Sequence, residues 1–135
     1  MRIMLDTNVL ISGFAFHSQS LMEMMCWIGE AHQLVLSTYV ISELKEVIVR
    51  KAPGLQNALD AFLLHLPYEL CYTPERIPDN HLPFEIRDPD DIAVLYSAII
   101  AEADVLITGD KDFAEIKIEK PEILTPSEFM AKYHQ

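Results

Sequence analysis

The chain has 135 residues, half of them hydrophobic, and carries 21 acidic against 10 basic side chains, for a formal net charge of −11. This length fits one domain over residues 1–135, and the apolar content permits a sizeable core, which excludes intrinsic disorder. The acidic balance argues against broad, charge-driven binding to a nucleic-acid backbone. It suits a protein that collects divalent cations or binds a basic partner.

Two further features concern location and redox state. No apolar run approaches the roughly 20 residues needed to span a bilayer, and Asp6 comes too early for a signal peptide, so we expect a soluble, cytoplasmic protein that does not bind membranes. The two cysteines, Cys26 and Cys71, form no C-x-x-C pair and lie among apolar residues. They are predicted to be buried, reduced thiols.

In the first half of the chain, short apolar runs alternate with helical patterns. The run Ile3–Leu5 predicts a buried strand that ends at a loop beginning with Asp6. The elements expected next are a Met-rich helix over Ser20–Ile28, a strand over Gln33–Leu36, a helix capped by Ser37 or Thr38 that runs to about Lys51 before Pro53-Gly54, and a helix over Leu55–Leu66.

The second half continues the alternation. The expected elements are a strand over Tyr68–Tyr72, a proline-containing loop over Thr73–Arg87, a helix over Asp88–Ala103, a strand over Val105–Thr108, a helical turn over Asp112–Glu115, a strand over Ile123–Leu124 and a helix over Ser127–Tyr133. Short apolar strands that alternate with helices predict an α/β fold, with a central parallel sheet covered by helices on both faces.

Two aspartates follow predicted strands directly. Asp6 comes after the first strand, and Asp110 follows the strand at Val105–Thr108 through a single glycine. Because ligands of parallel sheets bind at the carboxyl ends of the strands, both side chains are expected at the functional edge. Each aspartate alone is equally well explained as a residue that favours a turn.

Glu43 lies at the border of the apolar stripe of its helix, next to Val40 and Val47. A carboxylate on a core-facing surface is costly unless it is paired or bound to a metal. The sequence leaves open whether Glu43 binds a metal, forms an ordinary salt bridge or reaches solvent.

Three aspartates open the clearest helix. Asp88 suits the N-cap, Pro89 suits the first helical position, and acidic residues favour the first turn. Helix chemistry therefore explains all three, but Asp91 precedes Val94 and Ala98 on the buried side and should point inward. We favour Asp91 over Asp90 as a ligand, with Asp88 as the cap.

Converging carboxylates of this kind fit Mg²⁺ or Mn²⁺, which prefer oxygen ligands. Such an ion can polarise a phosphodiester and supply a hydroxide nucleophile. The five histidines lack the spacing of a zinc site, and the sequence contains no P-loop, G-x-G-x-x-G or G-x-S-x-G motif.

Four segments together resemble the PIN-domain nucleases. Leu5–Ser12 is similar to the opening of that family, Thr38–Glu43 to its second motif, Asp88–Ala98 to its third and Ile107–Phe113 to its fourth. The four segments occur in the family's order and span nearly the whole chain.

The resemblance implies a three-layer α/β/α sandwich and Mg²⁺- or Mn²⁺-dependent endonucleolytic cleavage of single-stranded RNA. It implies that the four acids of the site are Asp6, Glu43, Asp91 and Asp110. Asp112 would be a fifth metal ligand, and the supporting polar residues would be Asn8, Thr108, Asp88 and Asp90. Many small members are toxins of toxin–antitoxin pairs, VapC-like in type, so the resemblance also implies an antitoxin partner and a homodimer.

Since the chain is acidic overall, any RNA binding must depend on a small group of basic residues near the site. Basic residues that flank the motifs, and so could contact phosphates at the rim of the site, are Lys45, Arg50, Lys51, Arg87 and Lys111. Scattered, solvated side chains explain them equally well.

Two other functions fit parts of the pattern. A phosphoacceptor receiver domain also has an acidic Mg²⁺ pocket, but it needs its acidic pair after the first strand, whereas Asp90-Asp91 comes late. A PIN fold that no longer cleaves and serves only as a binding module would not need the full set of four acids, which this chain retains.

Overall fold

The computed structural model describes residues 1–77, 84–86, 88–113 and 115–134. Within them, five parallel strands form one sheet in the order β3-β2-β1-β4-β5. The strands are β1 (Arg2–Leu5), β2 (Gln33–Ser37), β3 (Glu69–Cys71), β4 (Val105–Ile107) and β5 (Glu122–Leu124). The α-helices are α1 (Thr7–Phe14), α2 (Gln19–Ala31), α3 (Thr38–Lys51), α4 (Gln56–His65), α5 (Pro89–Ile100) and α6 (Pro126–Tyr133). Short 3₁₀ turns are η1 (Pro53–Leu55) and η2 (Lys111–Phe113).

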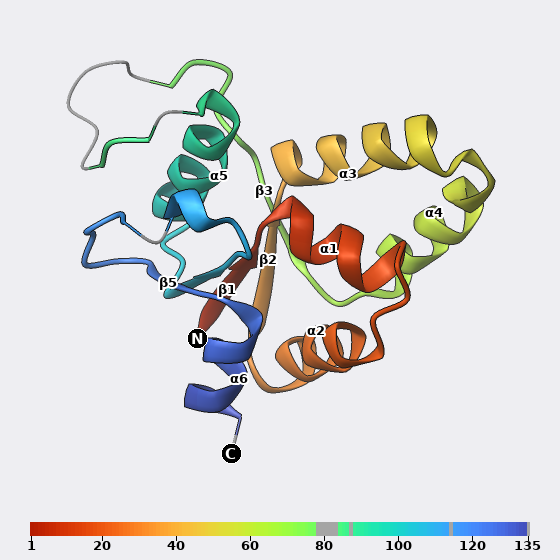
Figure 1. Cartoon of the computed structure of the whole chain (residues 1–135), viewed down its shortest axis with the longest axis horizontal. Coiled ribbons are helices and arrows are strands. Elements are labelled where there is room, and N and C mark those ends of the chain that lie inside the picture. Colours follow the sequence, from red (N-terminus) through yellow and green to blue (C-terminus); the bar gives the residue numbers. More distant parts are fainter. Residues whose placement is uncertain (78–83, 87, 114, 135) are drawn as a thin grey trace.

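The helices cover both faces of the sheet. From β1 to β3 the chain steps outward in one direction, and through β4 and β5 it steps in the other. Right-handed crossovers therefore place α1 to α4 on one face and α5 on the opposite face. Figure 1 shows this arrangement, with α1 to α4 to the right of the sheet and α5 to its left. The predicted three-layer α/β/α sandwich with a parallel sheet is confirmed.

The core is built from the three central strands and the helix stripes that face them. β1, β2 and β4 are buried on both faces, with Ile3, Leu34, Leu36, Leu106 and Ile107 fully inaccessible. Strands of a parallel sheet covered on both sides read as continuous apolar runs rather than as alternating ones. This explains why these short segments were recognisable in the sequence.

Helix ends follow local capping chemistry. Ser37 accepts a hydrogen bond from the Val40 backbone N–H and begins α3, as predicted for Ser37 or Thr38. Asp88 caps α5 through the backbone N–H of Asp90, also as predicted. Thr125 and Glu128 form a reciprocal capping box that begins α6.

Several predictions about local structure were wrong, among them the end of the Met-rich helix, since α2 runs to Ala31 and not to Ile28. Asp6 does not open a loop: it is the N-cap of α1, because its carboxylate accepts from the Thr7 backbone N–H. Helix α5 ends at Ile100 rather than Ala103, since the chain turns at Glu102, which has a φ of 55°. Cys26 is exposed on α2 instead of buried, and Cys71 is half-buried.

The loop predicted over Thr73–Arg87 has no helix or strand among its described residues, and residues 78–83 and 87 lie outside them. Among the described helices, none is both long and apolar enough to cross a membrane.

Leu106→Ala tests the central position of β4. Leu106 is fully buried, so the substitution should leave a cavity and lower the free energy of unfolding by about 2–5 kcal/mol. Leu64→Ala on α4 is the matched control, because Leu64 is 80% exposed and its loss should cost no more than about 0.5 kcal/mol. Urea unfolding measures both, and equal losses would contradict the described core.

Candidate metal centre

Asp6 and Asp110 follow the two strands at the centre of the sheet. β1 and β4 are parallel neighbours, with Leu5 opposite Ile107, so both strands end at the same edge. The chain leaves β1 toward one side of the sheet and β4 toward the other. This is the topological switch point of the sheet, where open α/β folds bind their ligands.

A chain of hydrogen bonds connects these two strand ends. The buried Thr108 hydroxyl donates to Asp6 Oδ2 at 2.7 Å, and the Asp110 backbone N–H donates to the Thr108 hydroxyl oxygen at 3.0 Å. The Asp112 backbone N–H then donates to Asp110 Oδ1 at 2.9 Å. Thr108 thereby fixes the position of Asp6 relative to Asp110.

Helix α3 brings Glu43 to this edge from the next strand of the sheet. Glu43 is half-buried, and the Tyr39 hydroxyl lies 3.3 Å from its Oε2 and 2.6 Å from Asp90 Oδ1. Tyr39 thus links α3 to the first turn of α5. It was not recognised from the sequence; its i, i+4 spacing from Glu43 was visible, but its contact with a residue 51 positions away was not.

The three aspartates of α5 differ in their surroundings. Asp88 is exposed and caps the helix, and Asp90 is exposed and accepts from Tyr39. Asp91 is only 7% exposed, and its Oδ2 is buried with no hydrogen-bond partner in the described structure. The inward orientation predicted for Asp91 is therefore observed.

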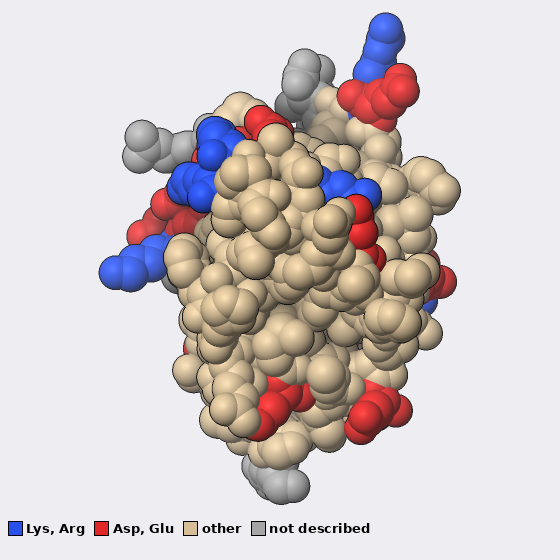
Figure 2. Space-filling view, turned by 90° about the vertical axis from the view of Figure 1, so that its right-hand side faces the viewer, with Lys and Arg blue, Asp and Glu red and all other residues tan. Residues whose placement is uncertain are grey.

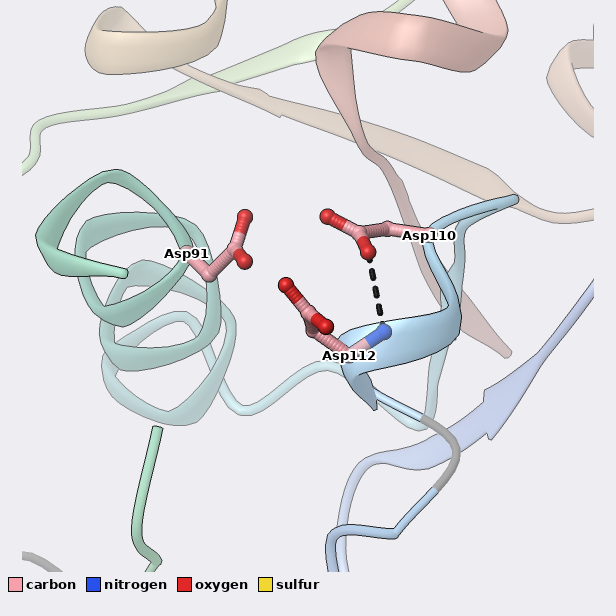
Figure 3. Close-up of side chains that lie close together, drawn as sticks. All are labelled: Asp91, Asp110 and Asp112. Atoms are coloured by element: carbon pink, nitrogen blue, oxygen red, sulfur yellow. Dashed lines mark hydrogen bonds between the residues drawn. The ribbon is translucent and has the colours of Figure 1, made fainter. Parts of the chain in front are cut away.

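The carboxylates converge on one small cavity. A space of about 170 Å³ is lined by Asp6, Asn8, Glu43, Asp88, Asp90, Asp91, Val94 and Asp110. Oxygens of Asp91, Asp110 and Asp112 also lie within 4.8 Å of one another. Figure 3 shows these three side chains pointing toward one another, with Asp91 on α5, Asp110 on the segment that leads into η2 and Asp112 in η2. The four acids expected to form one site therefore share a cavity.

This crowding changes the protonation of the acids. Burial, together with the charges of Asp110, Asp88, Asp6 and Asp112, raises the pKa of Asp91 to about 7. Burial also raises the pKa of Asp6, although hydrogen bonds from Thr108 and Thr7 partly oppose that shift. Burial and the neighbouring Asp90 and Glu43 carboxylates raise the pKa of the Tyr39 hydroxyl, which therefore stays a donor at neutral pH.

The donor set fits a hard divalent cation. All the candidate ligands are carboxylate oxygens; Asp91 lies beside other acids, and its buried Oδ2 has no donor in the described structure. Oxygens on opposite sides of a Mg²⁺ ion are about 4.2 Å apart, twice the usual ligand distance, so the observed grouping is close to what one ion needs. A bound cation would offset the repulsion among these acids.

The basic residues predicted at the rim do not form one group. Arg50 and Lys51 line a groove beside the cavity, and Lys111 is exposed in η2 next to Asp110. Lys45 instead lines a separate depression with residues of α4. Arg87 lies outside the described residues.

Comparisons with known proteins fit this arrangement. The family model described as PIN domain matches residues 2–112. The fold is similar to a chain in the crystal structure of VapBC2 from Rickettsia felis bound to a DNA fragment from their promoter, with a TM-score of 0.67, 19% identity, and coverage of 92% of this chain and 97% of that one. A comparison with curated proteins found no match.

The raised pKa of Asp91 predicts how stability depends on pH. In the protein without divalent cations, folded Asp91 keeps its proton up to about pH 7, whereas an unfolded aspartate loses it near pH 3.9. The native state therefore binds more protons between these values, and this group makes the free energy of unfolding fall as pH rises from about 4 to about 7.

Asp91→Asn should remove that contribution, so its melting temperature in EDTA should fall less over this range than that of the wild type. Asp60→Asn, at an exposed position on α4, should retain the wild-type slope. A wild-type slope in Asp91→Asn would mean that Asp91 ionises normally in the folded protein.

Proposed function

Since the chain belongs to the PIN-domain family, as the match over residues 2–112 shows, we propose that it is a metal-dependent endoribonuclease that cleaves single-stranded RNA. The observation that carries the proposal is the cavity lined by Asp6, Glu43, Asp91 and Asp110 at the switch point of the sheet. These four acids are the proposed catalytic and metal-binding residues, with Asp112 as a fifth ligand. The proposed cofactor is Mg²⁺ or Mn²⁺, and the proposed location is the cytoplasm.

The residues of the site would have different roles in cleavage. When bound, the cation would polarise the scissile phosphate and lower the pKa of a water molecule. Asp6 and Asp110 would hold it, with Thr108 keeping Asp6 in place through its 2.7 Å hydrogen bond. Asp91, whose buried Oδ2 has no donor in the described structure, would supply a further oxygen to the cation.

Tyr39 favours Asp91 over Asp90 as the third ligand. Because the Tyr39 hydroxyl donates to Asp90 at 2.6 Å, Asp90 is already hydrogen-bonded at the mouth of the cavity. Asp91 Oδ2 has no such donor in the described structure. We therefore assign Asp91 to the metal and Asp90 to the positioning of Tyr39 and Glu43.

The receiver-domain alternative does not agree with the fold. Receiver domains have the strand order 2-1-3-4-5, whereas this sheet has β3-β2-β1-β4-β5. A PIN fold that does not cleave and serves only as a binding module is the other alternative, and an activity assay separates it from the nuclease.

We also propose an antitoxin partner and a homodimer, as in VapC-like toxins. The structure from Rickettsia felis is described as a VapBC2 assembly, which motivates both. The net charge of −11 suits a basic partner segment. Equimolar antitoxin should abolish RNA cleavage, and full activity in its presence would reject the antitoxin proposal. Light scattering should give twice the mass of the chain, and a monomeric mass would reject the homodimer.

The direct test is cleavage of unstructured and structured RNA with Mg²⁺, with Mn²⁺ and with EDTA. The wild type should cut unstructured RNA only when a divalent ion is present, and Asp6→Asn should be inactive under every condition. Cleavage that persists in EDTA, or in Asp6→Asn, would reject the proposed site.

Metal binding has its own readout in thermal unfolding. Millimolar Mg²⁺ or Mn²⁺ should raise the melting temperature, because the ion binds the folded state and relieves repulsion among the acids. The rise should disappear in a variant that combines Asp6→Asn with Asp110→Asn. A rise of wild-type size in this double variant would place the ion at another site.

A final pair of variants separates the cap of α5 from the proposed ligand. Asp91→Asn should abolish cleavage without loss of stability, because asparagine keeps the shape of the side chain but removes the charge that a hard cation needs. Asp88→Ala should remain active and lose about 1 kcal/mol of stability, as is typical for a lost N-cap. An active Asp91→Asn, or an inactive but fully stable Asp88→Ala, would mean that the roles of ligand and helix cap have been assigned to the wrong residues.

A further inference from the structure

A larger groove continues from the acidic cavity. It has a volume of about 780 Å³ and lies between α1 and α3. Asn8, Glu43 and Asp90 line both the cavity and the groove, so the two spaces adjoin each other. A molecule that enters the cavity can therefore extend along the groove.

One face of α3 forms a wall of this groove. Tyr39, Glu43, Glu46 and Arg50 are spaced by three or four residues, which places them on the same side of the helix. The helical rise puts Arg50 about 10 Å along the axis from Glu43. This wall therefore passes from the acidic cavity to a basic end.

The basic end has free cationic groups. Arg50 and Lys51 are both exposed in the last turn of α3, and neither forms an ion pair with the part of the chain that the structure describes. Cations at a helix C-terminus interact favourably with the helix dipole. The helix dipole does not explain why Arg50 and Lys51 line a groove. A phosphate bound at this end of the groove would be contacted by both side chains.

The opposite wall carries an exposed aromatic ring. Phe16 follows α1, lines the groove and is 75% exposed, which is unusual for a phenylalanine. The next residue, His17, has a φ of 53°, so the chain turns sharply there. An exposed ring beside a groove offers a surface on which an unpaired base can stack.

Figure 2 views the molecule from the side on which α3 ends. Lys and Arg side chains lie along the upper part of this face, close to Asp and Glu side chains, above a wide area that carries neither charge. Positive charge on this face is therefore confined, which agrees with local binding of phosphate instead of a broad basic surface.

We propose that the groove between α1 and α3 binds the RNA strand on one side of the scissile phosphate, with Arg50 and Lys51 contacting a backbone phosphate and Phe16 stacking on a base. This inference rests on the proposed nuclease function. The rise of about 10 Å along the axis of α3 from Glu43 to Arg50 corresponds to the length of about three stacked nucleotides, at about 3.4 Å for each nucleotide. Since only an unpaired base can stack on Phe16, the groove would select single-stranded over double-stranded RNA.

A binding experiment tests the groove without requiring cleavage. Anisotropy of a fluorescein-labelled ten-nucleotide RNA with Mg²⁺ gives the dissociation constant, with every variant made in an Asp91→Asn background so that the RNA stays intact. All substitutions below are at exposed positions, and circular dichroism and melting temperature check that each variant is folded.

Arg50→Gln should weaken binding by about fivefold or more and reduce the slope of log Kd against log salt concentration by about 1, as expected for one lost phosphate contact. Phe16→Ala should weaken binding of the single strand by at least about fivefold, since stacking on one base is worth about 1–3 kcal/mol. The same substitution should have no effect on binding of a duplex.

Two comparison variants on α3 test whether position, and not overall charge, matters. Lys45→Gln removes a positive charge outside the groove and should leave the dissociation constant unchanged. Glu46→Gln removes a negative charge from the groove wall and should strengthen binding. If Lys45→Gln and Arg50→Gln weaken binding equally, or if Arg50→Gln and Phe16→Ala bind as the parent does, the groove is not the RNA path.

The proposed nuclease function and the proposed RNA groove would be contradicted by different results. Wild-type protein that cleaves RNA, combined with unaffected Arg50→Gln and Phe16→Ala binding, overturns the groove and keeps the nuclease; the groove would then be open to a protein segment. Wild-type protein that does not cleave, combined with the expected binding differences, overturns the nuclease and supports the groove as an RNA-binding site.

Discussion

The hydrogen bond from Thr108 to Asp6 holds the site together. It joins residues 102 positions apart at the ends of the two central strands, and both partners are buried. A buried carboxylate is stable only when its oxygens find donors or a cation. The Thr108 hydroxyl donates to Asp6 and accepts from the Asp110 backbone N–H, so the position of the fourth-motif loop depends on the residue that directly follows β4.

The rest of the structure has to tolerate the electrostatic repulsion among the acids of the site. Asp91 lies opposite Asp110 with no donor for its buried Oδ2 in the described structure. The Tyr39 hydroxyl contacts both the Asp90 and the Glu43 carboxylates but carries no positive charge that would offset theirs. The apolar core of β1, β2 and β4 supplies the stability that tolerates this arrangement. A fold that is stable around an unfavourable cluster is the usual condition of a site that binds a cation.

Local signals made much of the fold predictable. Apolar runs identified all five strands, and caps such as Ser37 and Asp88 gave the starts of α3 and α5. Helix α1 was missed altogether because Asp6 was expected to begin a loop, although an aspartate before a helix is also a good cap. The separation of Lys45 from Arg50 could have been inferred from helical periodicity. The bond between Tyr39 and Asp90 could not, since only the folded sheet brings α3 beside α5.

The two ends of the described chain lie together, away from the carboxyl edge of the sheet. The terminal ammonium of Met1 contacts His32, and the rings of both His32 and His134 pack edge-on against Trp27 on α2. Figure 1 shows both ends below the sheet, while the strands point toward α1, α3 and the start of α5. A fluorophore, affinity tag or surface tether attached at either end would thus leave the acidic cavity and its groove facing free solution.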